Sequence, residues 1–339
     1  MKTSFRLATL ALVASAALAI AGNAFATQTM TVAQTSSALT IKVAQPQTDP
    51  QPAQITIYLP STNQLSATQP PPGSTIGTTT GHVFARDLGI PLPLTGQVIT
   101  RDPTQYTDNP CSPGPQLAVW DLQLSVAGQT INILVYVSQT TGDETALGAA
   151  KLVVCLAPAD VPAGTPGRSP MGAQLLDATF TVNNVVKPTT TSSTWSSKWI
   201  PYGVSSAQVN PAGTVQVMSV VAPGAATIKT QVLSKKLKKV RITGRVTQGG
   251  KPAAGATVNL LLNSRSRFKT KTNAAGAYTF VLRNTRTTVT VTFFQASAAA
   301  AARSVTSAYC PSAPIPNVPC ASATASPFTA LSKKVRLKL

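Results

Sequence analysis

Apolar residues recur with a period of two along most of this chain, and that spacing constrains the fold more than any other feature. From Trp120 to Val126 every second residue is apolar, and after Ala127 to Thr130 the alternation resumes from Ile131 to Val137. Residues two apart lie on the same face of a β-strand. The pattern therefore predicts a hairpin of two strands with one buried face.

Similar runs, separated by loops rich in proline and glycine, cover much of the chain. They are Leu39 to Val43, Ile55 to Leu59, Lys151 to Leu156, Ala178 to Val186, Val215 to Val221 and Thr227 to Leu233. The 27 prolines and 21 glycines favour short strands over long helices. Only the alanine-rich segment Ala296 to Ala302 predicts a short helical turn. We therefore predict an all-β protein with two β-sandwich domains of Ig-like or transthyretin-like type in tandem.

Residues 1–26 have the pattern of a secretory signal peptide. Lys2 and Arg6 precede an apolar run from Leu7 to Ile20, and Ala24-Phe25-Ala26 is a small-x-small cleavage site. A short membrane anchor is the competing interpretation, but the run is short for a bilayer span. We expect a secreted protein, in solution or associated with the cell envelope, whose mature part has no transmembrane segment.

Cys111, Cys155, Cys310 and Cys320 are the four cysteines of the chain. An even number in an exported chain predicts two disulfide bonds. Of the three pairings, Cys111–Cys155 with Cys310–Cys320 keeps each bond within one predicted domain. A zinc site is the alternative, but the chain has no Cys-x-x-Cys and a single histidine.

Charge changes abruptly along the chain. The last carboxylate side chain is Asp177, so the final 162 residues contain none. Lys229 to Leu339 carries 19 lysines and arginines, whereas Thr27 to Ile228 carries seven basic and nine acidic residues. Such an asymmetry favours interaction with polyanions.

The change of composition near Leu233 places the predicted domain boundary. The first domain spans 27–233 and the basic second domain spans 234–339. The run of serine and threonine from Thr189 to Thr194 is interpreted as a long loop within the first domain, because strand-like segments follow it before the charge changes.

The second domain carries a specific order of turns and strands. Gly244-x-Val246 is followed by Gly250-x-Pro252-x-x-Gly255-Ala256-x-Val258 and by Thr272-x-x-x-Gly276-x-Tyr278-x-Phe280. This set resembles the carboxypeptidase regulatory-like domains, also called transthyretin-like or prealbumin-like β-sandwiches, over about 238–295, and to 339 if Lys333 to Leu339 supplies the last strand. The resemblance implies a non-catalytic module of an exported or surface protein. The first domain shows no such resemblance.

Nine cations of this domain alternate with other residues along predicted strands, which places each group on one side of a sheet. They are Lys239, Arg241, Arg245, Arg267, Lys269, Lys271, Lys334, Arg336 and Lys338. One interpretation is that they keep the sheet soluble and its edges unpaired. The other is a binding face for polymers rich in phosphate or carboxylate. In an exported protein, envelope polymers, lipid head groups and acidic polysaccharides come before nucleic acid, for which the chain has no recognition motif.

Few residues have the spacing of a catalytic site. His82 is the only histidine and no Gly-x-Ser-x-Gly is present, so we expect a structural or surface histidine. Asp102, Asp108, Asp143 and Glu144 are the candidates for a glycosidase pair or a Ca²⁺ site. Loop capping and solubility explain these four carboxylates more simply.

The aromatic group Trp195, Trp199 and Tyr202 has two interpretations. Exposed rings would stack on sugars, whereas buried rings would pin a long loop onto the core. Trp120, among alternating apolar residues, is a core residue.

These patterns predict an exported, non-catalytic structural or adhesive protein. Its basic C-terminal β-sandwich would contact anionic polymers of the cell envelope or its surroundings. The alternative is a secreted protein that binds or processes carbohydrate with its first domain. No cofactor, metal or catalytic residue is predicted, and nucleic acid is disfavoured as a partner.

Overall fold

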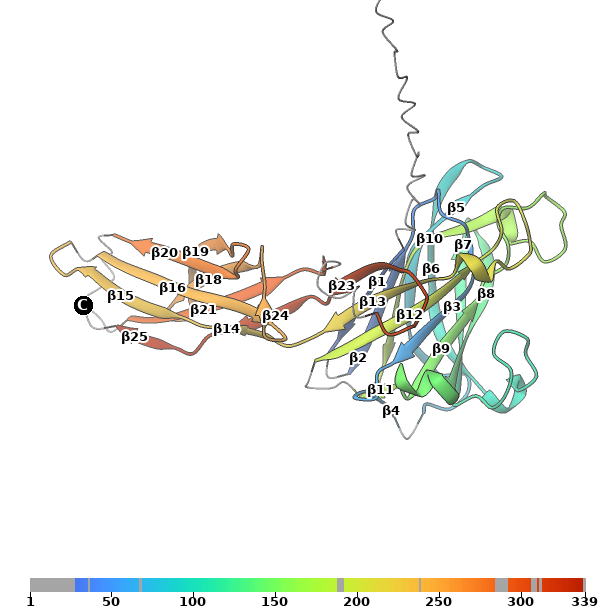
Figure 1. Cartoon of the computed structure of the whole chain (residues 1–339), viewed down its shortest axis with the longest axis horizontal. Coiled ribbons are helices and arrows are strands. Elements are labelled where there is room, and N and C mark those ends of the chain that lie inside the picture. The colour runs from blue at the N-terminus through green and yellow to red at the C-terminus, as the bar shows by residue number, and fades with distance from the viewer. Residues whose placement is uncertain are drawn as a thin grey trace, which may run out of the picture.

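The computed structural model of this chain is all-β, as the sequence predicts, and its strands form a large lobe and a small lobe (Figure 1). It describes residues 28–337 except 36, 67–68, 188–191, 238, 284–291, 306–309 and 311–312. The predicted signal peptide lies outside these residues. In the part described, no helix is long and apolar enough to cross a membrane.

The large lobe is built on one 13-stranded sheet with the order β1-β2-β10-β5-β6-β7-β8-β9-β3-β12-β13-β23-β22. Its strands are β1 (Thr29–Gln34), β2 (Ala38–Ala44), β3 (Pro52–Leu59), β5 (Thr75–Ala85), β6 (Ile90–Arg101), β7 (Ala118–Val126), β8 (Gln129–Gln139), β9 (Ala150–Cys155), β10 (Ala173–Asn183), β12 (Ser193–Pro201), β13 (Val215–Val221), β22 (Arg303–Ser304) and β23 (Cys320–Ala325). Neighbouring strands are antiparallel except β13 and β23, which are parallel.

Short elements complete the large lobe. A separate two-stranded sheet pairs β4 (Gln64–Leu65) with β11 (Val186–Lys187). The described connections include the 3-10 helices η1 (Pro103–Tyr106), η2 (Gly142–Ala146), η3 (Pro170–Gly172) and η4 (Pro211–Gly213).

The predicted hairpin is confirmed as β7 and β8. Ala127 and Gly128 join the two strands with φ values of 48° and 78°, the positive values that a two-residue hairpin turn with the right twist requires. Trp120 is completely buried on the inner face of β7, as predicted. The other runs with period two lie largely in strands, but Asn184 and Val185 separate β10 from β11 within the run from Ala178 to Val186, and Thr227 and Ile228 precede β15.

The large sheet rolls up until its first strand meets its other end. The Val32 N–H of β1 donates to Ser219 Oγ of β13 over 2.9 Å, and Thr324 Oγ1 of β23 donates to the carbonyl of Met30 over 2.5 Å. Side chains therefore join β1 to β13 and β23 where backbone pairing stops. The rolled sheet encloses the apolar core of this lobe, which includes Trp120, Trp195 and Trp199.

The small lobe consists of two five-stranded sheets. In the first sheet, β16 (Lys239–Gln248) pairs with β14 (Gly224–Ala226), β15 (Lys229–Ser234), β17 (Lys251–Pro252) and β20 (Ala277–Leu282). The second has the order β19 (Arg265–Lys271), β18 (Thr257–Leu262), β21 (Thr292–Ala300) and β24 (Phe328–Leu331), with β25 (Val335–Leu337) also on β21. The inner faces of the two sheets share one apolar core, which makes this lobe a sandwich. Its predicted Ig-like or transthyretin-like type stays a prediction.

Gly244 shows how closely this core is packed. It lies opposite Tyr278 on β20, whose hydroxyl donates to the carbonyl of Thr227 over 2.6 Å. A Cβ atom at Gly244 would lie 2.0 Å from that carbonyl oxygen and 2.4 Å from the Tyr278 hydroxyl. The glycine of the predicted motif thus leaves the space in which the tyrosine crosses to its acceptor.

In the part of the chain that the structure describes, three passages run between the lobes, and each joins one strand directly to another with two residues between them. The joints are β13 to β14, β21 to β22, and β23 to β24. At this junction Gln248 Nε2 donates to the Ser326 carbonyl over 2.9 Å, and Arg303 Nη1 donates to Gln248 Oε1 over 2.7 Å. The two lobes are therefore tied together by backbone and by buried hydrogen bonds.

Strand pairing crosses the predicted boundary at residue 233 in both directions. β14 precedes the boundary and β15 spans it, but both belong to the small lobe, whereas β22 and β23 follow it but belong to the large sheet. The predicted helical turn at Ala296 to Ala302 is wrong, because β21 runs to Ala300. Burial of Ala296 and Ala298 against the core outweighs the helical propensity of alanine.

Candidate functional site

The predicted cations of the small lobe lie on the outer faces of its two sheets. Arg241 and Arg245 are exposed on β16, where they alternate with the buried Val240, Ile242 and Val246, and Lys239 on the same face is half-buried. Paired residues of an antiparallel sheet share a face, so Arg241 lies beside Gln231 and Val281. This surface, called the β16 face below, is the outer side of the first sheet.

The second set of cations lies on the other sheet. Arg267, Lys269 and Lys271 are exposed on β19, and the Arg336 guanidinium on β25 lies over the Phe293 ring, 5.9 Å from its centre. Lys334 is exposed just before β25, and Lys338 lies outside the described residues. This surface is called the β19 face. The shared core separates it from the β16 face, so the nine predicted residues do not form one surface.

The two lobes differ in how their charges are balanced. In the large lobe Arg86 pairs with Asp160, Arg168 with Asp87, Arg101 with Asp121, and both Lys151 and Lys198 with Glu144. The small lobe has no carboxylate side chain of its own, because none follows Asp177 in the sequence. Its cations therefore present an unbalanced positive charge to the solvent.

Two of the four candidate carboxylates of the large lobe, Asp102 and Glu144, have local hydrogen-bond partners. Asp102 accepts from the Thr104 N–H at the start of η1, and Asp108 is exposed on the loop that follows. Asp143 and Glu144 lie in η2, away from η1 in the sequence. Asp102 therefore caps η1, and Glu144 takes part in ion pairs with Lys151 and Lys198.

Glu144 has the most contacts among these carboxylates. It accepts from the Tyr58 hydroxyl over 2.8 Å and from Lys151 Nζ over 2.5 Å. Partial burial raises the pKa of the Glu144 carboxyl, but the hydrogen bonds from Lys151 and Tyr58 and the nearby lysine charges outweigh it and lower that pKa. Burial and the hydrogen bond to Glu144 raise the pKa of Tyr58. Glu144 is thus a structural anion that joins β3 to β9.

His82 is a surface histidine, as expected. Its Nδ1 atom lies 2.9 Å from Asp177 Oδ2 on the neighbouring strand β10, and 56% of its side chain is exposed. Across the described residues, no group of three or more His, Cys, Asp and Glu side chains is placed to hold a metal ion.

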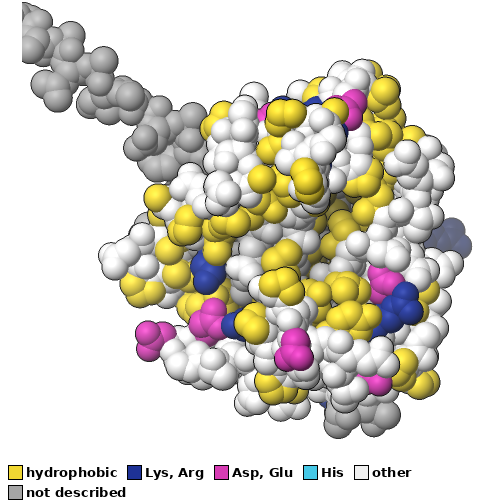
Figure 2. All heavy atoms as spheres, turned by 90° about the vertical axis from the view of Figure 1, so that its right-hand side faces the viewer, with side chains coloured by type: hydrophobic (Ala, Val, Ile, Leu, Met, Phe, Trp, Pro, Cys, Tyr) yellow, Lys and Arg dark blue, Asp and Glu magenta, His cyan; other side chains and the backbone are white. Residues whose placement is uncertain are grey.

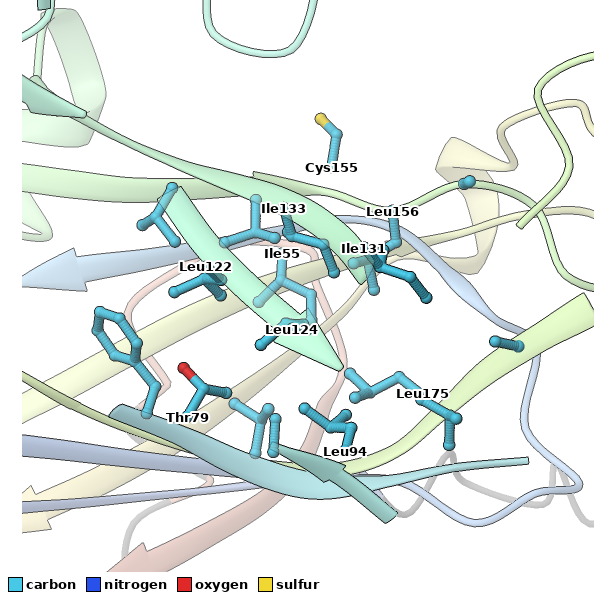
Figure 3. A pocket seen from close by; sticks show the side chains of 18 of the residues that line it. Ile55, Thr79, Leu94, Leu122, Leu124, Ile131, Ile133, Cys155, Leu156 and Leu175 are labelled. Atoms are coloured by element: carbon cyan, nitrogen blue, oxygen red, sulfur yellow. The ribbon is translucent and has the colours of Figure 1, made fainter. Parts of the chain in front are cut away.

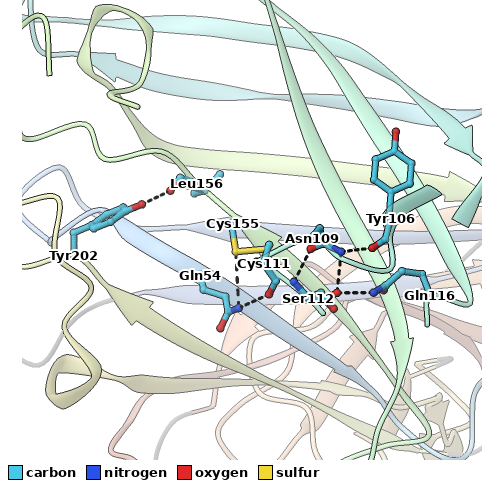
Figure 4. Close-up of a disulfide and its surroundings, with 9 residues drawn as sticks. All are labelled: Gln54, Tyr106, Asn109, Cys111, Ser112, Gln116, Cys155, Leu156 and Tyr202. Carbon is cyan, nitrogen blue, oxygen red and sulfur yellow. Dashed lines mark hydrogen bonds between the residues drawn. A yellow bond between two sulfur atoms is a disulfide. The ribbon is translucent and has the colours of Figure 1, made fainter. Parts of the chain in front are cut away.

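The aromatic group is buried on a strand. Trp195 and Trp199 lie on β12 and are 0% and 1% exposed, so neither ring is available to stack on a sugar. The Tyr202 hydroxyl donates to the Leu156 carbonyl over 2.7 Å (Figure 4). The predicted burial is confirmed. Of the described residues of the predicted loop, Ser193 and Thr194 belong to β12, whereas Ser192 lies outside a strand.

Both predicted disulfides are present, Cys111–Cys155 and Cys310–Cys320. The first ties the loop after η1 to the end of β9, where Gln54 Nε2 donates to the Cys111 carbonyl over 3.0 Å (Figure 4). The second closes onto the first residue of β23. Two disulfides are compatible with a protein outside the cytoplasm.

Sequence reasoning missed a cavity inside the rolled sheet of the large lobe. It has a volume of about 320 Å³, and apolar side chains from facing walls line it, among them Ile55, Leu94, Leu124, Ile133, Leu175 and Phe180 (Figure 3). Figure 2 shows the end of this lobe that faces away from the small lobe, where hydrophobic side chains gather between charged ones. Alternation predicts that these residues point inward but not that they leave a space between them.

Comparisons with known proteins give no match to a family model or to a curated protein. The resemblance of residues 238–295 to carboxypeptidase regulatory-like domains therefore stays a prediction.

Proposed function

We propose that this protein is exported and attaches to anionic polymers through its small lobe. The observation that carries the proposal is the unbalanced positive charge on the β16 and β19 faces, in a lobe that has no acidic side chain. Polymers rich in phosphate or carboxylate, such as those of a cell envelope, are the expected partners. The role is structural or adhesive, without catalysis.

Strand geometry supports attachment to an extended polymer. Alternate residues of a strand are roughly 7 Å apart along its axis, so Lys269 and Lys271 form a short row, and so do Lys239 and Arg241. Such rows match repeated anionic groups along a chain without requiring one fixed pose. Attraction of this kind is long-ranged at low salt and is screened within a Debye length of about 8 Å at physiological ionic strength.

The sandwich core adds a geometric consequence. The two cationic faces point in opposite directions, with sheets about 10 Å apart between them. One straight polymer segment therefore contacts one face at a time, and the two faces contribute separately. This arrangement favours attachment within a mesh of polymer over attachment to a single flat surface.

The test is the salt concentration at which the full mature chain elutes from a heparin column. The variants are R241Q/R245Q on the β16 face and K269Q/K271Q on the β19 face. The matched control is K42Q/K187Q, which removes two exposed lysines of the large lobe. We expect both small-lobe variants to elute at clearly lower salt than the control. Equal shifts for all three variants would show that net charge alone, and not the small lobe, causes retention.

The alternative, a carbohydrate-binding or carbohydrate-processing protein, has less support. Trp195 and Trp199 are buried, and Asp102 and Asp108 lie on a different connection from Asp143 and Glu144. The cavity is lined by none of these residues. We therefore place the polymer contact on the small lobe.

A further inference from the structure

The cavity of the large lobe lies between walls that the fold fixes. Ile41 and Ile55 come from β2 and β3, Leu124 and Ile133 from the β7–β8 hairpin, and Phe180 from β10. In Figure 3, Thr79 and Leu94 lie below the cavity, and Ile133 and Leu156 lie above it. Strand pairing saturates the backbone of these walls, so side chains decide what the cavity accepts.

The lining is apolar but remains open to solvent. Ile131, Ile133, Leu175 and Phe180 are only half-buried although they point into the rolled sheet. Water in such a space finds few of the two to four polar partners that hold an ordered molecule. Replacing this water with an apolar molecule removes the wall side chains from water, which is favourable roughly in proportion to the area covered.

The size of the cavity suits a small organic molecule. An apolar protein cavity of about 150 Å³ accepts one benzene ring, and the 320 Å³ here is about twice that volume. Ligand sites commonly begin near 300 Å³. One molecule with two fused rings, or a short branched chain, is therefore the expected occupant.

Two hydroxyl groups of the cavity lining, those of Thr79 and Ser169, have no hydrogen-bond partner among the described residues, and Thr79 is the more deeply buried of the two. Thr79 is 1% exposed on β5, and its Oγ1 atom has no hydrogen-bond partner among the described residues. A buried hydroxyl without a partner is costly and uncommon in folded proteins. Thr79 stands between Gly96 on one neighbouring strand and Phe180 on the other, so the hydroxyl lies next to the largest apolar side chain of the lining.

The absence of charged side chains from the described lining limits which ligands the cavity can bind. Of the described residues that surround the cavity, none is Asp, Glu, Lys, Arg or His. A charged group would lose its hydration there without compensation. We propose that the cavity binds one uncharged, largely apolar small molecule whose single hydroxyl or carbonyl group hydrogen-bonds to Thr79. This site is independent of the polymer contact on the small lobe.

The experiment measures binding of 1-naphthol and of 1-methylnaphthalene to the full mature chain with its disulfides intact, by equilibrium dialysis. The two probes have similar shape, and only 1-naphthol carries a hydroxyl. We expect one molecule of either probe per chain, with 1-naphthol bound more tightly. Absence of saturable binding of both probes would overturn the proposal.

Three variants locate the site. A178L adds a larger side chain inside the cavity, and T179L, on the opposite face of the same strand β10, is its matched control. We expect A178L to weaken both probes at least tenfold and T179L to leave them unchanged. L175W, at a half-buried position of the lining, gives a second obstruction if A178L does not fold. Unchanged binding in a folded A178L or L175W would place the probes elsewhere and overturn the proposal.

T79V tests the polar contact, since valine has nearly the shape of threonine without the hydroxyl. We expect the affinity for 1-naphthol to fall roughly fivefold, the scale of one hydrogen bond, while the affinity for 1-methylnaphthalene stays the same. An equal change for both probes would contradict the role assigned to Thr79.

Discussion

The two lobes use the same alternation of apolar and polar residues and arrive at different interiors. In the large lobe, one sheet rolls around bulky side chains such as Trp120 and Phe180 and leaves a cavity. In the small lobe, two sheets share a core in which small residues such as Ala296 and Ala298 pack with the rings of Tyr278 and Phe280, and Gly244 leaves room for Tyr278 on the neighbouring strand. The number of sheets that share a core, and the size of its residues, decide whether space remains.

The lobes also treat charge in opposite ways. The large lobe places most of its cations next to carboxylates, and Asp121 is even buried in such a pair. The small lobe exposes its cations with no carboxylate of its own. Charge is therefore part of the folded structure in the large lobe and remains available to a partner in the small lobe.

A larger side chain placed in each core should give the largest difference between the lobes in the loss of unfolding free energy. A298L places a leucine in the closely packed core of the small lobe, where Ala298 is completely buried. We expect a loss of about 3 kcal/mol in the free energy of unfolding. A178L points into the cavity of the large lobe and should cost less than about 1 kcal/mol. Urea unfolding followed by circular dichroism measures both variants, and equal losses would mean that the cavity is not a real difference between the lobes.

Removing one charged side chain from each lobe should give the next largest difference in the loss of unfolding free energy. D121N leaves Arg101 without its buried partner, and we expect a loss of about 1–3 kcal/mol in the free energy of unfolding, less than for a fully buried pair because Arg101 is 38% exposed. R241Q removes an exposed cation among like charges and should change the same quantity by less than about 0.5 kcal/mol. Urea midpoints of the two variants provide the measurement. A substantial loss in R241Q would show that the β16 face contributes to folding.

Two buried threonines extend the comparison to hydrogen bonds. Thr272 Oγ1 in the small lobe donates to the Ala253 carbonyl over 2.5 Å and accepts from the Ala256 N–H over 2.9 Å, whereas Thr79 Oγ1 in the large lobe has no partner among the described residues. We expect T272V to lose about 1–2 kcal/mol of unfolding free energy and T79V to lose none or to gain slightly. Thermal unfolding of both variants checks this, and a large loss in T79V would reveal a partner for that hydroxyl.

Acid should destabilise the large lobe before the small lobe. This is the smallest of the four changes in stability that we predict. The pKa of Glu144 is lowered in the folded protein, so the stability it adds is present above its unfolded value near 4.5 and is lost as the pH falls through the lower folded value. All three tryptophans lie in the large lobe, so their fluorescence follows that lobe alone. We expect thermal midpoints from tryptophan fluorescence to fall below pH 4.5, and to fall less in E144Q.

Amide hydrogen exchange at Val258 and Leu260, buried on β18, follows the small lobe under the same conditions. Because this lobe has no carboxylate side chain, protection there should hold over the same pH range. A parallel loss of protection in both lobes would mean that the acid response is global and does not arise from Glu144.

The sequence predicted local structure well because alternation is a local property. The β7–β8 hairpin, the burial of Trp120 and both disulfides followed from spacing and from the partition of the cysteines. The return of β23 to the large sheet did not, since Val217 and Ser322 pair across more than 100 residues and no local pattern marks that contact. The helical turn predicted at Ala296 to Ala302 was wrong for a related reason. Burial of alternate alanines in a sheet stabilises the strand more than the helical propensity of alanine favours a helix.

The candidate sites show the same limit. Alternation correctly placed Arg241 and Lys269 on outer faces, but it did not reveal that they belong to two sheets facing opposite ways. The cavity depends on the distance between walls that are far apart in the chain, such as Ile55 and Leu124. Nothing in the sequence distinguishes Thr79 from other threonines of a strand, because its place in the cavity lining depends on how the sheet rolls up.

The three passages between the lobes have a mechanical consequence. If the small lobe is held by a polymer while the large lobe is pulled, the load divides among the β13–β14, β21–β22 and β23–β24 joints. No single joint then acts as a hinge on which the lobes swing apart. Forced extension would have to slide β13 along its antiparallel neighbour β12 and break the buried Gln248 contacts together. The same passages mean that one proteolytic cut at the junction leaves the lobes joined.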